Sequence, residues 1–154
     1  MFFEKAAQED IEELVTLRIA YLEEDHGVMS KEALQSIKAD LPDYFARHLN
    51  NDVIAYIARN EERIVSCAIL YMMEKPMSPA FLNGKVGTVM NVYTRPGYRR
   101  RGYAKQLMKM LLSDAVDKNL CFVELKATEE GYDLYKSLGF KEEVSRYHYM
   151  KWSN

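Results

Sequence analysis

The segment that decides the fold, residues 92–105, reads VYTRPGYRRRGYAK. Its β-branched and aromatic start, Val92–Thr94, is typical of a strand, and Pro96-Gly97 ends that strand. The small residues Gly102 and Ala104 lie where a helix with an apolar face begins. The first amides of a helix have no acceptor in their own helix and lie at the positive end of its dipole. The segment therefore predicts a strand, a turn and a helix start that binds a phosphate or pyrophosphate.

Two other phosphate loops do not fit this turn. The spacing from Gly97 to Gly102 is that of a nucleoside triphosphate loop, but Tyr103 follows where that loop needs lysine. The dinucleotide pattern GxGxxG is absent. A basic helix start in solvent, without a ligand, remains the alternative for this turn. Three consecutive arginines without a wider basic patch do not indicate nucleic acid.

Composition indicates one globular domain over residues 1–154. Hydrophobic residues make up 48% of the chain and charged residues 29%, and the net charge of −2 gives no global attraction for nucleic acid or acidic membranes. The N-terminus lacks the pattern of a signal peptide, and no run approaches about twenty apolar residues. We expect a cytoplasmic protein that does not contact membranes.

The cysteines and histidines do not have the spacing of a metal site. Cys67 and Cys121 lie in apolar runs, so we expect two buried thiols. His26, His48 and His148 are scattered along the chain, and we expect no metal.

The N-terminal part predicts a strand followed by helices. The strand is expected at Phe2–Lys5 and an amphipathic helix at Glu9–Glu24. Arg18 interrupts the apolar face of that helix, and we expect its stem to pack while its head reaches water. A second helix from Ser30 should break near Asp40–Pro42, because proline in a helix loses a hydrogen bond and clashes with the preceding turn.

The remaining pattern is strand-rich, with two helices between strands. It predicts a mixed α/β (α+β) chain with a largely antiparallel sheet. The expected elements are a hairpin of Asp52–Arg59 and Ile64–Met73, a strand at Lys85–Thr94, a helix at Gly102–Lys118, a strand at Cys121–Lys126, a helix at Gly131–Leu138, and strands at Phe140–Val144 and Tyr147–Lys151.

Two motifs resemble those of the GNAT superfamily of N-acetyltransferases. Residues 99–104, RRRGYA, match the signature Arg/Gln-x-x-Gly-x-Gly/Ala, and residues 96–99, PGYR, resemble the Pro-x-Tyr-Arg that leads into it. Residues 134–140, LYKSLGF, resemble the family's Leu-Tyr-x-x-x-Gly-Phe. The resemblance implies a central, mostly antiparallel twisted sheet with a splayed parallel strand pair, flanked by about four helices. The splayed pair would be Lys85–Thr94 and Cys121–Lys126.

The resemblance also implies acetyl transfer from acetyl-CoA to a primary amine of a small molecule or peptide. In the family, the strand before the signature pairs with the pantetheine arm, and the turn amides hold the pyrophosphate. The cofactor-binding residues expected from the turn and the resemblance are Val92, Tyr93, Thr94, Arg99, Arg100, Arg101, Gly102, Tyr103, Ala104, Lys105 and Thr128.

The catalytic residues carried over by position are Tyr135, as the general acid for the leaving thiolate, and the backbone amide of Val92, which would polarise the thioester carbonyl. A merely packing role for Tyr135 is the alternative. Glu124 and Asn91 are candidates for the base, as are three residues at the end of the first helix: Glu23, Glu24 and His26. Many members of the family carry Asn at the position of Thr128 and Ala at that of Gly131.

Three readings of the function stay open. The first is a small-molecule acetyltransferase, the second a non-catalytic module that binds or senses acyl-CoA, and the third a protein lysine or N-terminal acetyltransferase. The loop at Lys75–Lys85 would decide whether a peptide groove exists. Acidic residues of the first helix could attract polyamines or aminoglycosides, but such runs are more often a solvated face. The resemblance is also compatible with a homodimer.

Overall fold

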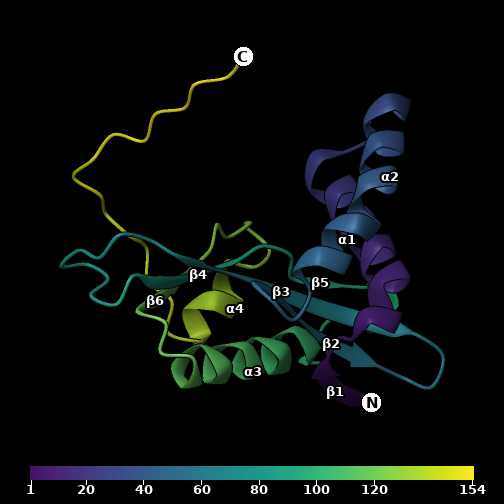
Figure 1. The fold of residues 1–154 in the computed structure, drawn as a ribbon. Helices are drawn as coiled ribbons and strands as arrows, with labels where there is room; N and C mark the ends of the chain where they lie inside the picture. Colours follow the sequence, from purple (N-terminus) through teal and green to yellow (C-terminus); the bar gives the residue numbers. More distant parts are fainter.

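The computed structural model describes all residues, 1–154, and contains one six-stranded sheet (Figure 1). The strand order is β1-β2-β3-β4-β6, and β5 pairs with β3 beyond the end of β4. The strands are β1 (Phe2–Lys5), β2 (Val53–Arg59), β3 (Ile64–Glu74), β4 (Lys85–Val89), β5 (Tyr93–Thr94) and β6 (Phe122–Glu124). All pairs are antiparallel except β4 and β6, so the predicted mixed α/β class is confirmed.

Helices cover both faces of this sheet, as Figure 1 shows. They are η1 (Gln8–Asp10), α1 (Ile11–His26), α2 (Lys31–His48), η2 (Pro96–Tyr98), α3 (Tyr103–Asp117) and α4 (Tyr132–Ser137). Leu14, Leu17 and Phe45 of α1 and α2 join one apolar cluster, while Leu107 and Leu111 of α3 join the cluster on the opposite face. None of the helices has the length and apolar character needed to cross a membrane.

The hairpin of β2 and β3 forms the centre of the core. Its residues are buried on both faces, which explains why its sequence is a continuous apolar run rather than an alternating one. The turn is fixed by Asn60, whose side-chain oxygen accepts hydrogen bonds from the amides of Glu62 and Arg63, at 3.0 and 2.9 Å. The hairpin predicted from the sequence is therefore confirmed.

The strand predicted at Lys85–Thr94 is interrupted. Val89 is opposite Leu70 of β3, and Tyr93 is opposite Cys67, so three residues of this strand face only two of β3. One extra residue in a strand pair is a β-bulge, which bends the strand and re-aims the side chains within it. The bulge, Met90–Val92, carries the buried side chain of Asn91.

The parallel strands β4 and β6 pair over only three residues. Their register runs from Val86 opposite Phe122 to Thr88 opposite Glu124, and no pairing continues beyond that point. The bulge at Met90–Val92 begins two residues later. The splayed strand pair implied by the family resemblance is therefore present, and both strands leave unpaired backbone beyond their last contact.

Two predictions about local structure are wrong. Helix α2 continues across Pro42, because Phe45 and Leu49 beyond it are held in the apolar core and outweigh the one backbone hydrogen bond that proline cannot make. Cys121 is exposed, with its thiol donating to the side-chain oxygen of Asn83 at 2.9 Å, whereas Cys67 is buried as expected. Cys121 precedes β6 at the rim of the sheet, where no helix covers it.

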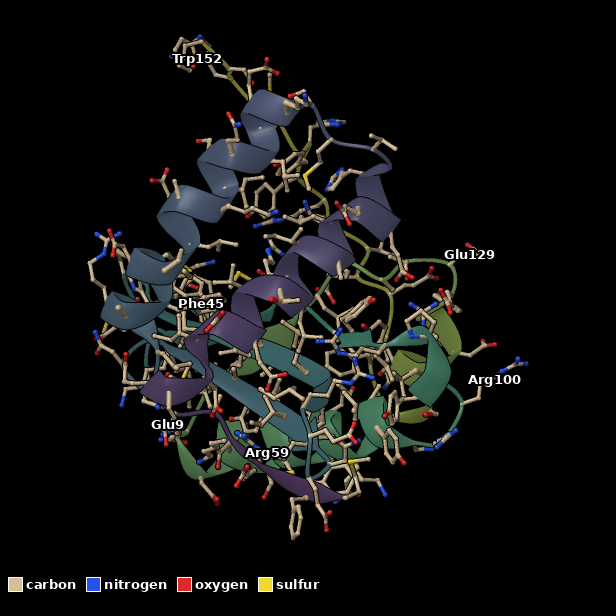
Figure 2. All side chains as sticks on the ribbon, turned by 90° about the vertical axis from the view of Figure 1, so that its right-hand side faces the viewer. Glu9, Phe45, Arg59, Arg100, Glu129 and Trp152 are labelled. Carbon is tan, nitrogen blue, oxygen red and sulfur yellow. The ribbon has the colours of Figure 1, made fainter.

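The terminal strands predicted at Phe140–Val144 and Tyr147–Lys151 do not form. Residues 141–154, here called the C-terminal tail, run away from the body of the protein (Figure 1), and Trp152 lies at its periphery in Figure 2. A strand exists only with a hydrogen-bonded neighbour, and β6 pairs with β4 alone, so its second edge is free. The tail exposes five large apolar side chains, Val144, Tyr147, Tyr149, Met150 and Trp152.

We predict that Asp10→Ala lowers the free energy of unfolding by about 2 to 3 kcal/mol, as measured by urea denaturation. The Asp10 carboxylate is only 5% exposed, accepts from the Ala7 amide at 2.8 Å and pairs with Arg59 at 2.6 Å. The matched control is Glu9→Ala, an exposed neighbour whose loss should change stability by less than about 0.5 kcal/mol. Equal stability of the two variants would show that this buried carboxylate does not hold β2 to the start of α1.

Candidate active site

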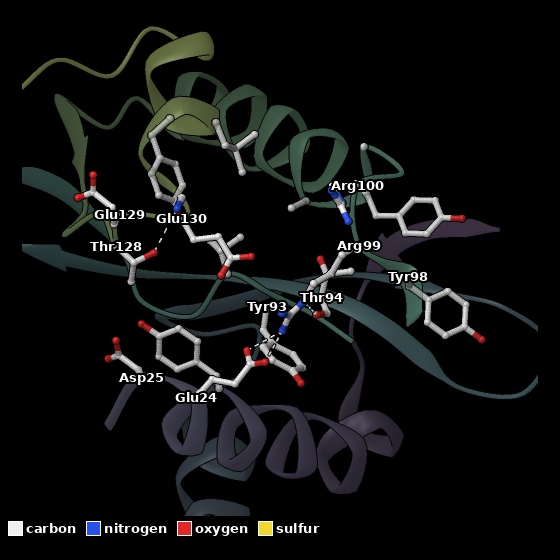
Figure 3. Close-up of a pocket in the computed structure, with 18 residues that line it drawn as sticks. Glu24, Asp25, Tyr93, Thr94, Tyr98, Arg99, Arg100, Thr128, Glu129 and Glu130 are labelled. Carbon is white, nitrogen blue, oxygen red and sulfur yellow. Dashed lines mark hydrogen bonds and ion pairs between the residues drawn. The ribbon is translucent and has the colours of Figure 1, made fainter. Parts of the chain in front are cut away.

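A cavity of about 530 Å³ lies beyond the point where β4 and β6 part (Figure 3). Its walls come from the end of α1, the strand–turn–helix of residues 92–104, and residues 128–135 with the start of α4. The lining residues are Tyr21, Glu24, Asp25, Val92, Tyr93, Thr94, Tyr98, Arg99, Arg100, Gly102, Tyr103, Ala104, Thr128, Glu129, Glu130, Gly131, Leu134 and Tyr135.

The turn before α3 has the form of an anion cradle. Arg100 and Gly102 both adopt left-handed backbone conformations, with φ of 58° and 79°, and Gly102 caps α3 without any side-chain hydrogen bond. A Cβ atom added at Gly102 would meet nothing within 4 Å, so the space above it is open. The first amides of α3 therefore face a space that the chain leaves free, at the positive end of the helix dipole. This geometry fits a pyrophosphate.

Arg99 is tied to α1 across the cavity, as Figure 3 shows. Its Nη2 lies 2.5 and 2.6 Å from the two carboxylate oxygens of Glu24, and its Nε donates to the Thr94 carbonyl at 2.9 Å. Hydrogen bonding to Glu24 raises the pKa of the Arg99 guanidinium, although partial burial opposes the shift. Arg99 thus lines the site, but a carboxylate already neutralises its charge.

The other basic residues of the turn are placed differently from one another. Arg100 lines the cavity, whereas Arg101 and Lys105 do not, and Arg101 lies over the Tyr98 ring at 5.6 Å. Figure 2 shows Arg100 and Glu129 on the same side of the molecule, on the two loops that flank the cavity. Of the expected cofactor-binding residues, all except Arg101 and Lys105 line the cavity.

Tyr135 lies at the junction of this cavity and a smaller one. Burial, followed by the nearby Tyr21, raises the pKa of its phenol to about 12, so the hydroxyl keeps its proton at neutral pH. That hydroxyl has no hydrogen-bond partner within the chain, while the ring packs edge-on against Phe140 with centroids 5.9 Å apart. Tyr135 therefore presents a free proton donor to both cavities.

The smaller cavity, of about 30 Å³, lies against the β-bulge. It is lined by Tyr21, Val89, Met90, Asn91, Val92, Leu125, Lys126, Thr128 and Tyr135. The Asn91 side chain is fixed at both ends, because Arg18 donates to its Oδ1 at 3.1 Å and its Nδ2 contacts the Cys67 sulfur at 3.4 Å. An amide held in this way has no basic atom to offer, so the geometry does not support Asn91 as a base.

Most of the other candidate bases do not line either cavity. Glu124 is exposed on β6 and lines neither cavity, and neither do Glu23 and His26. Glu24 lines the larger cavity but is paired with Arg99.

Sequence reasoning missed Tyr21, Asp25, Glu129 and Glu130, and it placed the head of Arg18 in water. The head is instead half-buried and donates to Asn91. Tyr21 gave no signal, because it falls on the apolar side of a helix, where an aromatic residue reads as core.

Comparison with known proteins identifies the family. The sequence model of the acetyltransferase (GNAT) family matches residues 12–140. This chain belongs to the GNAT family. No curated protein sequence matches it. A predicted acetyltransferase of Clostridium acetobutylicum, solved with acetyl-CoA, is 27% identical to this GNAT chain, with a TM-score of 0.84 over 97% of this chain and 95% of the other.

Two further structures share the fold of this GNAT protein. A GCN5-related N-acetyltransferase of Ralstonia eutropha JMP134 is 21% identical, with a TM-score of 0.81 over 97% of each chain. A metagenomic aminoglycoside acetyltransferase from uncultured soil is 19% identical, with a TM-score of 0.72 over 97% of each chain. At these identities the likeness establishes the fold alone. The family and its fold are those of acetyl transfer, and GNAT proteins use acetyl-CoA.

We predict that Gly102→Glu weakens CoA binding by at least about 100-fold, measured by calorimetry. A carboxylate near a phosphate costs about 3 kcal/mol, and the new side chain would fill the open space above the turn. Gly102→Ala carries the same backbone strain at φ 79° without the charge, and Gly97→Glu adds the charge outside the cavity. Unchanged CoA affinity in folded Gly102→Glu would contradict the assignment of the cradle.

Proposed function

We propose that this GNAT protein is an acetyl-CoA-dependent N-acetyltransferase that acetylates a primary amine. The observation that carries the proposal is the free, protonated hydroxyl of Tyr135, which lines the same cavity as the anion cradle at the start of α3. A non-catalytic binding module would need the cradle but not a proton donor at the other end of the cavity. Thr128, which lines both cavities and accepts from the Gly131 amide at 3.2 Å, is proposed to contact the pantetheine arm.

The proposed binding mode follows the lining of the larger cavity. The amides from Arg100 to Lys105 would hold the pyrophosphate, and the backbone of Val92–Thr94 would pair with the pantetheine arm. When bound, acetyl-CoA supplies the activated acetyl group. The Val92 amide, at the end of the bulge, would donate to the thioester carbonyl as negative charge develops on its oxygen.

The chemistry then needs two proton movements. The neutral amine attacks the carbonyl carbon, the new C–N bond forms and the C–S bond breaks, and the amine nitrogen loses one proton. Tyr135 donates its proton to the leaving thiolate and is restored from solvent. Glu24 is paired with Arg99, and the other lining carboxylates, Asp25, Glu129 and Glu130, are exposed to solvent, so we propose that water carries the amine proton from the cavity to solvent.

We predict that Tyr135→Phe lowers kcat by about 100-fold or more while leaving the affinity for acetyl-CoA unchanged. Thiol release measures the first quantity and calorimetry the second. Tyr132→Phe, on the same helix but outside both cavities, is the matched control and should retain the wild-type rate. Full activity in Tyr135→Phe would refute its role as the acid.

The pH profile gives a second readout of the same residue. Because the pKa of Tyr135 is raised to about 12, its protonated form persists across neutral and mildly alkaline pH, so kcat should not fall between pH 7 and 10. A falling limb with a midpoint below pH 10 in the wild type, lost in Tyr135→Phe, would show that the environment of the phenol is not the one described.

We also propose that the protein forms a homodimer through the C-terminal tail. The tail exposes four large side chains between Tyr147 and Trp152, and the second edge of β6 lacks a partner. If the tail of one copy adds a strand to β6 of another, the large side chains of the tail are covered and the edge of β6 gains a hydrogen-bonded partner. Light scattering should then give twice the chain mass of 18.0 kDa, and a variant truncated after Glu143 should be monomeric. A full-length monomer would contradict this arrangement.

A further inference from the structure

Arg18 is a half-buried cation without a counter-ion. Of the half-buried arginines, Arg59 and Arg99 pair with carboxylates, and Arg95 donates to the Ile64 carbonyl at 2.9 Å. Arg18 makes one hydrogen bond, to the neutral Oδ1 of Asn91, and no carboxylate lies within 4.0 Å of it. A guanidinium has five N–H donors, so most of its hydrogen-bonding capacity is unused by the chain.

The position of this cation is next to the reacting end of the site. Asn91, which accepts from Arg18, is only 1% exposed, lines the smaller cavity and directly precedes Val92. The Arg18 guanidinium carbon lies 5.7 Å from the ring centre of Tyr21, which lines both cavities together with Tyr135. Arg18 itself lines neither cavity, but its hydrogen bond to Asn91 places it directly behind the wall of the smaller cavity.

Two tyrosine side chains lie near the cation: the Tyr21 ring centre is 5.7 Å from the guanidinium carbon, and the charge of Arg18 acts on the phenol of Tyr44. Burial raises the pKa of Tyr44, with Asp52 and Tyr71 adding to the shift and Arg18 opposing it, so Tyr71 and Arg18 are both close to this phenol. The hydroxyls of Tyr21, Tyr44 and Tyr71 make no hydrogen bond within the chain. A carboxylate accepts hydrogen bonds from a guanidinium and from hydroxyl groups, so it is the kind of ligand that would use these free donors.

We propose that the acceptor is an amine that also carries a carboxylate, and that Arg18 binds this carboxylate. The inference rests on the proposed function, because it names the acceptor class of the same site. A guanidinium takes a carboxylate through two parallel N–H donors, which orients the rest of the molecule. Glu129 and Glu130, on the loop before α4, line the larger cavity without forming ion pairs, and they favour the ammonium end of such a zwitterion. This assignment places the acceptor carboxylate toward α1 and its amine toward Val92 and Tyr135.

Lys126 is the competing cation. It lines the smaller cavity too, but it is exposed and its ammonium lies over the Tyr149 ring at 5.7 Å. A solvated ammonium discriminates weakly between charged and neutral acceptors, because water screens it. Separate substitutions of Arg18 and Lys126 show which of the two binds the carboxylate.

The test uses acceptor pairs that differ only in the carboxylate: glycine, β-alanine, phenylalanine and glutamate, each with its carboxamide. At saturating acetyl-CoA, thiol release should favour the carboxylate member of the accepted pair by about 10- to 100-fold in kcat/KM. Arg18→Gln should bring this ratio close to one by lowering kcat/KM for the carboxylate and not for the amide. Arg47→Gln, an exposed arginine of α2, is the matched control and should keep the ratio.

Three outcomes would overturn the assignment. Amides or polyamines accepted as well as carboxylates would show that the acceptor needs no anion. If Arg18→Gln lowers kcat/KM equally for the carboxylate and for its carboxamide, Arg18 only positions Asn91. If Lys126→Gln loses the preference for the carboxylate over its carboxamide while Arg18→Gln keeps it, the acceptor carboxylate binds Lys126 and not Arg18.

A binding readout separates this inference from the proposed function. The same carboxylates should raise the melting temperature of the wild-type protein loaded with CoA, which has no acetyl group to transfer, but not that of Arg18→Gln. If no carboxylate stabilises the loaded wild type, the acceptor class is wrong even when acetyl-CoA binds and other amines are acetylated. If acetyl-CoA itself does not bind, the proposed function fails first.

Discussion

The parting of two parallel strands is the constraint on which the rest of this structure depends. β4 and β6 share only the register from Val86–Phe122 to Thr88–Glu124, and the bulge at Met90–Val92 turns the chain away just beyond it. Backbone groups that would pair in a continuous sheet are therefore left for another partner. The cavity opens at this point, and its two sides continue from the two strands that have parted.

Around this opening the charges are divided between three segments. The turn before α3 contributes helix amides and Arg100, the end of α1 contributes Glu24 and Asp25, and the loop before α4 contributes Glu129 and Glu130. The pair formed by Glu24 and Arg99 joins α1 to the turn, and it leaves the helix amides and Arg100 as the unpaired positive features of the cavity. A phosphate group is thus directed to the turn, and an ammonium group to the loop before α4.

The site was largely predictable where one local segment builds it. The signature at residues 99–104 dictates a tight turn and a helix start, and helix amides face outward whatever the remainder of the fold does. Tyr135 could be placed because it is in a motif of fixed spacing. Arg18 and Tyr21 were not predictable as site residues, because their importance comes from contacts with residues 73 positions away, as in the bond from Arg18 to Asn91.

Local patterns were sufficient to predict the strand–turn–helix, the central hairpin and the amphipathic helices, because these follow from the spacing of apolar residues and from local backbone preferences. Three features could be seen only in the folded chain: α2 passes through Pro42, a bulge breaks the strand after Lys85, and the tail forms no strand. Each of these depends on what a segment packs or pairs against: Phe45 in the core, Cys67 opposite Tyr93, and the free edge of β6. Such contacts join residues far apart in the chain, so no local pattern encodes them.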